Sequence, residues 1–96
     1  MKMVMIAYNE AIEAEVMEIL ENYGQKNYTK IPGAFGCGAA SGIHLGDDIW
    51  PGRNSILFIA CEDKLAKQML SGVKELRKTL KHEGLKAFIL PLEEIS

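Results

Sequence analysis

Several features that would mark a particular class of protein are scarce in this chain. Its 96 residues include two cysteines, two histidines, one tryptophan and three prolines. Cys37 and Cys61 form no C-x-x-C pair, which argues against a disulfide framework and favours a reducing, cytoplasmic location. No apolar run approaches the roughly 18 residues of a membrane span, so we expect no membrane insertion.

Excess charge of either sign is also missing. Eleven basic residues against thirteen acidic ones give a net charge of −2 and a pI near 5.6. This balance gives no electrostatic basis for binding nucleic acid. The apolar fraction of 48% and the charged fraction of 25% are ordinary for globular proteins. A chain of this length predicts a single domain over residues 1–96.

The spacing of apolar residues predicts the first half of the fold. Residues 2–8 are apolar at nearly every position and are typical of a buried strand. An apolar stripe at helical spacing then predicts a helix over 10–23, with Asn9 as its N-cap and Gly24 as its stop. Residues 26–31 alternate like a half-exposed strand, which we expect Pro32 to end.

The second half repeats the pattern. Residues 55–61 form the clearest central strand, and the next helix is expected to start at caps Glu62 and Asp63. Gly72 inside that helix has a propensity cost of about 1 kcal/mol, which indicates close packing there. The helix should break at Gly84. A last strand, Lys86–Leu92, contains Pro91 and therefore belongs at a sheet edge.

The order strand, helix, strand, strand, helix, strand is that of a ferredoxin-like α+β sandwich. Its usual strand order, 4-1-3-2, puts strands 2–8 and 55–61 in the middle. Two helices cover only one face of such a sheet, yet both faces of these central strands are apolar. The uncovered face predicts oligomerisation, in preference to a long loop folding back over it.

A glycine-rich loop over residues 32–54 is the most unusual segment. Its 23 residues hold six of the nine glycines, and so long a connection without periodicity is commonly functional. Three interpretations of the loop stay open. The first is an anion cradle, for which Gly36, Gly38 and Ser41 are typical residues. The second is a metal site with ligands from His44, Asp47 or Asp48, and Cys37. In the third, the loop docks on a neighbouring subunit through Phe35 and Trp50.

Catalysis finds little support in the sequence. There is no nucleophile with a neighbouring base and no paired acids on rigid elements. Arg53 and Asn54 are the residue types that an acylphosphatase-like enzyme uses in a phosphate cradle, but they follow a long loop. We therefore expect no enzymatic activity, and we interpret Arg53 and Asn54 as loop residues that contact a partner, together with Phe35, His44 and Trp50.

Three stretches of the chain resemble the PII-like nitrogen regulatory proteins, and the similarity in element order covers nearly the whole chain. Gly36 and Gly38 are similar to the G-x-G at the base of that family's long T-loop. The other two stretches are Lys86-Ala87-Phe88-Ile89-Leu90-Pro91-Leu92-Glu93, which resembles the family's last strand, and Trp50-Pro51-Gly52-x-Asn54-Ser55, which resembles a short branch of the family.

The resemblance implies a homotrimer that binds nucleotide in clefts between subunits and contacts target proteins through the loop. It implies that Lys86 meets phosphate. The leading hypothesis is thus a cytoplasmic, non-catalytic regulator whose partner is an unidentified protein, such as a membrane transporter or an enzyme. The ligand stays open between an adenine nucleotide and a divalent metal. The alternative is a trimeric metal-binding protein of CutA-like architecture, with His44, Asp47 and Asp48 as ligands.

Overall fold

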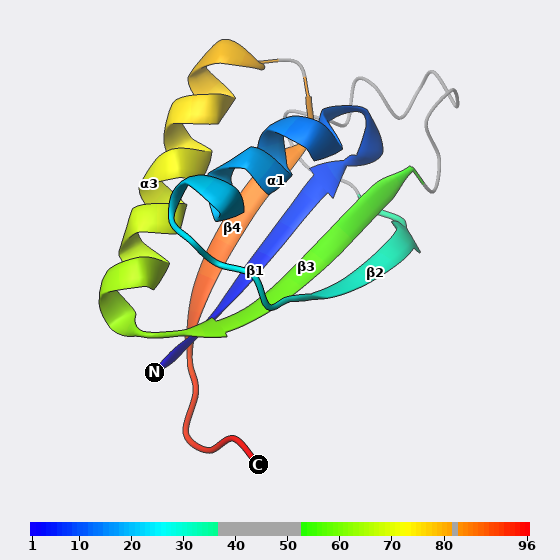
Figure 1. Ribbon diagram of the computed structural model, residues 1–96. Coiled ribbons are helices and arrows are strands. Elements are labelled where there is room, and N and C mark those ends of the chain that lie inside the picture. Colours follow the sequence, from blue (N-terminus) through cyan, green and yellow to red (C-terminus); the bar gives the residue numbers. More distant parts are fainter. Residues whose placement is uncertain (37–52, 82) are drawn as a thin grey trace.

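The computed structural model describes residues 1–36, 53–81 and 83–96 (Figure 1). Its elements follow the expected order and confirm the ferredoxin-like α+β fold. Predictions for residues 37–52 and 82 lie outside the described residues. The elements are β1 (Lys2–Asn9), the 3-10 helix η1 (Glu10–Ile12), α1 (Glu13–Asn22), β2 (Thr29–Ala34), β3 (Asn54–Cys61), α3 (Asp63–Thr79) and β4 (Leu85–Pro91).

The four strands form one antiparallel sheet in the order β2-β3-β1-β4. This is the predicted order, with β1 and β3 in the middle. Pro91 ends β4 at an edge of the sheet, where its missing N–H leaves no ladder bond unmade.

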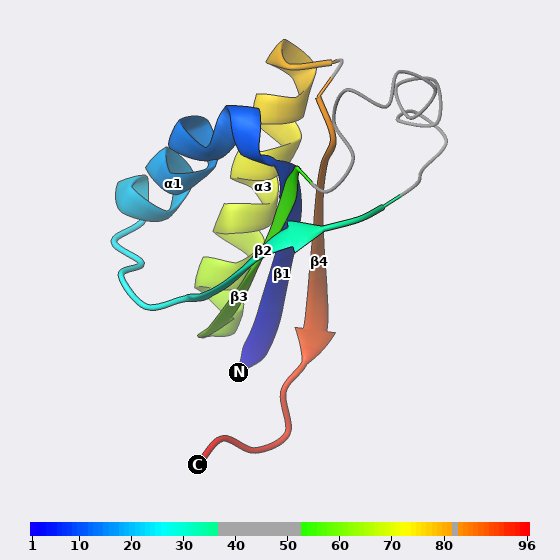
Figure 2. The ribbon, with the colours of Figure 1, turned by 90° about the vertical axis from the view of Figure 1, so that its right-hand side faces the viewer.

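Both helices lie on the same face of the sheet (Figure 2). The core fills the space between the layers, because alternate residues of β1 and β3 point toward the helices and are buried. Cys61 belongs to this core, as the apolar character of its strand indicated. Gly72 lies at the helix contact: a Cβ atom there would be 3.0 Å from Ile19 Cγ2. The predicted close packing at Gly72 is confirmed.

The start of the first helix differs from the prediction. Residues 10–12 form a 3-10 turn and α1 begins only at Glu13. Asn9 does cap the turn, because its side-chain oxygen accepts a hydrogen bond from the Ala11 N–H at 2.8 Å. Gly24 follows α1 with φ +72, the left-handed conformation that stops a helix.

The prediction that Pro32 ends the second strand was wrong. β2 runs from Thr29 to Ala34 and passes through Pro32. From Ile31 to Ala34 the strand advances three residues while β3 advances two, so a bulge takes up one residue. A proline is tolerated here because β2 is an edge strand, and Gly33 supplies the left-handed backbone with φ +72.

The second helix also begins and ends differently. Glu62 occupies the N-cap position without a side-chain cap bond, and Asp63 instead forms an ion pair with the Met1 amine at 3.5 Å. The helix ends at Thr79, before Gly84, because Leu80 leaves the helical conformation with φ −105 and ψ 62, although its N–H still bonds to the Leu76 carbonyl.

Candidate functional site

One end of the sheet gathers four chain segments, and we call it the loop end. Because the strands are antiparallel, the last residues of β1 and β2 lie beside the first residues of β3 and β4. Asn9 pairs with Asn54, and Ala34 pairs with the same asparagine from the other side. The long loop therefore leaves from β2 and returns to β3 at the same end where β4 begins.

Two backbone hydrogen bonds extend the ladders of β1 past the regular strands. The Asn9 N–H donates to the Gly84 carbonyl at 3.0 Å, and the Glu10 N–H donates to the Arg53 carbonyl at 2.7 Å. Gly84 precedes β4 and Arg53 precedes β3. The end of β1 thus holds both the return of the loop and the turn that leads to Lys86.

Lys86 stands on the face of the sheet opposite the helices. It pairs with Ala7 of β1 and is exposed. Within the described residues its side chain forms no hydrogen bond or ion pair. Two residues earlier, Gly84 has open space around it, since an added Cβ would meet no atom within 4 Å. An exposed ammonium beside an open turn is accessible to an anionic ligand.

The structure brings Gly36 to Asn54 but keeps both away from Lys86. A Cβ added to Gly36 would be 4.0 Å from Asn54 Nδ2. Gly36 follows β2 and Lys86 lies on β4, and these are the two edges of the sheet, three strand spacings or about 14 Å apart. The two residues predicted to bind ligand, Gly36 and Lys86, therefore lie at opposite edges of the sheet within one chain.

The remaining predicted site residues divide between described and undescribed parts. Phe35 is 78% exposed directly after β2, and Arg53 is exposed directly before β3. The other predicted residues, Gly38, His44, Asp47, Asp48 and Trp50, lie outside the described residues. Within residues 1–36, 53–81 and 83–96, no group of three or more His, Cys, Asp and Glu side chains could hold a metal ion. In the same residues, no helix has the length and apolar character needed to cross a membrane.

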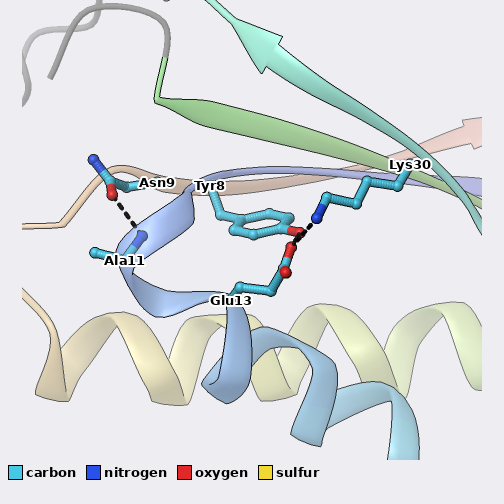
Figure 3. A network of polar contacts seen from close by, with 5 residues as sticks. All are labelled: Tyr8, Asn9, Ala11, Glu13 and Lys30. Carbon is cyan, nitrogen blue, oxygen red and sulfur yellow. Dashed lines mark hydrogen bonds and ion pairs between the residues drawn. The ribbon is translucent and has the colours of Figure 1, made fainter.

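A polar network that the sequence analysis missed ties β1, α1 and β2 together (Figure 3). The Tyr8 hydroxyl donates to Glu13 Oε1 at 2.6 Å, and Lys30 Nζ lies 2.5 Å from the same oxygen. The hydrogen bond from Lys30, and then that from Tyr8, lowers the pKa of Glu13 below its ordinary value. Burial and the Glu13 carboxylate raise the pKa of Tyr8. No sequence signal indicated this network, because its three residues belong to three different elements.

The face opposite the helices is largely apolar, with Thr29 and Lys86 as polar positions on its two edge strands. In the strand register, Met5 stands between Phe58 and Phe88, and Met3 stands between Ala60 and Leu90. Ile31 of β2 extends this open face beside Ile56. Three of its large side chains are close to half exposed: Ile31 at 47%, Phe88 at 44% and Leu90 at 43%. Figure 2 shows that the helices lie on the other side of the sheet. The interpretation that the helices leave one apolar face uncovered holds for the described residues.

The fold and the loop end define a small ferredoxin-like α+β protein with a long connection at one end of its sheet. Nitrogen regulatory protein P-II is the family that matches the sequence, over residues 1–96. The chain belongs to the P-II family, as its resemblance implied. No curated protein sequence matches the chain.

Solved structures of PII-like proteins share the fold. A PII-like signalling protein from Thermus thermophilus is 25% identical with a TM-score of 0.65, over 92% of this chain and 82% of that one. CPII, a nitrogen regulatory PII-like protein from Thiomonas intermedia bound to ADP, AMP and bicarbonate, is 17% identical with a TM-score of 0.69, over 92% and 84%. Its apo form is 15% identical with a TM-score of 0.63, over 93% and 89%.

Proposed function

We propose that the chain is a single-domain, non-catalytic signalling protein. It works as a homotrimer, senses a small ligand at the clefts between subunits and contacts a partner protein through loop 32–54. The observation that carries this proposal is the open apolar face of the sheet, in a chain that belongs to the P-II family. An exposed apolar patch of this extent is typical of a protein association site.

The positions of Gly36 and Lys86 support a ligand site between subunits. These residues flank opposite edges of one sheet, so a single phosphate group cannot meet both within one chain. When open faces associate around a threefold axis, the β2 edge of one subunit can approach the β4 edge of the next. Lys86 then supplies positive charge, and the Gly36 and Gly38 backbone permits close approach of an anion.

An adenine nucleotide is the ligand class that we favour. The structure of CPII, which shares this fold, is of the protein bound to ADP, AMP and bicarbonate. Lys86 is exposed, has no hydrogen-bond or ion-pair partner among the described residues and lies beside the open turn at Gly84, so its ammonium suits a phosphate group. A divalent metal held by His44, Asp47 and Asp48 remains the competing ligand, and it is an outcome of the test below.

The partner protein is expected to meet the loop and its two ends. Phe35 and Arg53 are exposed where the loop leaves β2 and returns to β3. An exposed aromatic ring and an arginine are residue types enriched at protein interfaces. With Asn54, His44 and Trp50 they form the proposed contact surface for a cytoplasmic partner, such as an enzyme or the cytoplasmic side of a membrane transporter.

Thermal unfolding with ADP tests the ligand site. A ligand that binds only the folded protein raises the melting temperature, and Lys86→Ala should abolish an ADP shift seen in the wild type. Lys67→Ala is the matched control, because Lys67 is an exposed lysine on α3, away from the loop end. Equal ADP shifts in wild type and Lys86→Ala would contradict a role of Lys86 in phosphate binding.

Zinc in the same assay separates the metal interpretation from the nucleotide one. If His44 is a metal ligand, His44→Ala removes a zinc shift and leaves an ADP shift unchanged. A zinc shift that weakens below about pH 6.5 would support a histidine ligand, since only neutral imidazole coordinates a metal. A zinc shift without any ADP shift would contradict the nucleotide proposal and favour the CutA-like alternative.

A further inference from the structure

The junction between β1 and η1 contacts both segments of the proposed site. Asn9 and Glu10 are consecutive residues, and their N–H groups bond to carbonyls on opposite sides. Successive N–H groups of an extended strand alternate in direction, so one residue faces β4 and the next faces β3. We propose that Asn9 is a positioning residue that couples the turn before Lys86 to the return of the loop at Arg53.

The backbone at Asn9 is what allows both bonds. Asn9 is still extended, with φ −73 and ψ 136, so its N–H continues the ladder toward Gly84. The chain then turns sharply into η1, yet the Glu10 N–H still reaches the Arg53 carbonyl at 2.7 Å. The bonds of the Asn9 and Glu10 N–H groups can therefore form together only if the chain changes from strand to 3-10 turn at Asn9.

The Asn9 side chain fixes the place of that change. Its Oδ1 accepts the Ala11 N–H at 2.8 Å, as Figure 3 shows. This bond satisfies one of the N–H groups that the first turn of a helix leaves without a backbone partner. Loss of the cap leaves η1, which has only three residues, free to unwind. The direction of the Glu10 N–H then changes with it.

A continuous chain of bonds results. It runs from the Gly84 carbonyl through the backbone of Asn9 and Glu10 to the Arg53 carbonyl. Gly84 lies two residues before Lys86. Arg53 belongs to the proposed partner-contact surface, at the point where the loop returns to β3. A ligand that fixes the Gly84 turn would thereby favour one position of Arg53. This inference rests on the proposed function for its ligand, but not for the bonds themselves.

Spatial connection alone does not demonstrate coupling, so the test measures it directly. Hydrogen exchange of the Asn9 and Glu10 amides reports the two bonds in the free protein. In Asn9→Ala, both amides should exchange about fivefold faster, the fold-change equivalent of a lost N-cap of ~1 kcal/mol. Asn9→Asp and Asn9→Ser keep a capping oxygen and should restore slow exchange.

A control variant separates positioning from general loss of stability. Val73→Ala removes buried side-chain atoms of α3 far along the chain from the junction. The variants and the wild type are compared at denaturant concentrations that give them equal global stability. The measured ratio is the exchange rate of the residue 9 and 10 amides divided by that of core amides, and Val73→Ala should leave this ratio at its wild-type value. If Asn9→Ala does not raise this ratio, or if Val73→Ala raises it equally, the proposal is overturned.

ADP provides the second measurement. In the wild type, ADP should slow the exchange of amides 53–55, and Asn9→Ala should remove this effect at an ADP concentration that still saturates the protein. Unchanged slowing of 53–55 in saturated Asn9→Ala contradicts the coupling. A wild type without any ADP binding contradicts the proposed ligand, while the exchange of Asn9 and Glu10 in the free protein still decides the positioning role.

Discussion

Gly72 of α3 packs directly against Ile19 of α1, and a Cβ atom at residue 72 would be 3.0 Å from Ile19 Cγ2. Ile19 is only 8% exposed, and the Tyr23 ring also borders the glycine, with a carbon 3.7 Å from the same Cβ position. The glycine therefore lets the two helices approach each other. This contact sets how closely α1 and α3 pack.

Substitution at this contact should show two opposing effects. Alanine is favoured over glycine in a helix by about 1 kcal/mol, but its methyl group here meets Ile19. We expect Gly72→Ala to be neutral or destabilising in the wild type, and stabilising by up to ~1 kcal/mol in an Ile19→Ala background. Urea unfolding of the four proteins of this double-mutant cycle measures the coupling. Equal effects of Gly72→Ala in both backgrounds would show that Ile19 does not limit the site.

Glu13 should make stability depend on pH in the acid range. Lys30 and Tyr8 lower the pKa of Glu13 from its ordinary value of 4.5. A carboxyl group with a lowered folded-state pKa contributes stability above its unfolded-state pKa and loses it as pH falls through the folded-state value. Glu13→Gln should therefore be less stable than the wild type at pH 7, and the difference should shrink progressively below about pH 4.5.

Chemical unfolding from pH 7 to pH 3 measures this difference. The matched control is Glu18→Gln, because Glu18 lies on the same helix, is exposed and forms no ion pair within the described residues. A pH-independent gap between wild type and Glu13→Gln would contradict the ionic part of the network. The size of the effect is moderated by solvent, since the Glu13 side chain is 39% exposed.

The sequence predicted the sheet better than the turns and the polar network. Strands 2–8 and 55–61 are apolar on both faces, which agrees with the central position that the usual strand order of a ferredoxin-like fold gives them. The prediction at Pro32 was wrong because the proline was interpreted as a strand end, whereas an edge strand with a bulge tolerates it. The bonds between Tyr8, Glu13 and Lys30 join three elements, so no spacing along the chain reveals them.

The candidate site was only partly readable for a similar reason. Residues within the loop stood out through its glycines, and Gly36 and Lys86 stood out through family resemblance. Asn9 was interpreted only as a helix cap. Its second role depends on the Gly84 and Arg53 carbonyls, which are distant in sequence and meet the β1 end only through sheet pairing.

Gly33 should be the position in β2 that is least tolerant of a side chain. Its φ of +72 is disfavoured for residues with a Cβ, although no neighbouring atom lies within 4 Å of the Cβ position. Gly33→Ala should therefore lower the free energy of unfolding by about 1–2 kcal/mol through backbone strain alone. Gly33→Asn should be milder, because asparagine adopts this conformation more readily. Urea unfolding measures both, and an alanine variant as stable as the wild type would argue against a fixed bulge.

Assembly through the open face of the sheet is the prediction with the widest consequence, because the ligand cleft depends on it. Phe88 lies on this face in the edge strand β4, where it pairs with Met5 and is 44% exposed. Light scattering of the wild type at micromolar concentration should give a mass near three chains. Phe88→Lys should give a mass near one chain, because a lysine ammonium buried between apolar sheets lacks a partner for its charge.

The matched control for Phe88→Lys places the same change outside the sheet face. Tyr23 is similarly exposed at 39%, but it caps the C-terminal end of α1 in the helix layer. Tyr23→Lys should leave the mass of three chains unchanged, and circular dichroism should show that both variants remain folded. A stable wild-type monomer would overturn the trimer. A Phe88→Lys protein that keeps the wild-type mass would move the interface away from this face, and the argument that joins Gly36 to Lys86 across subunits would fail with it.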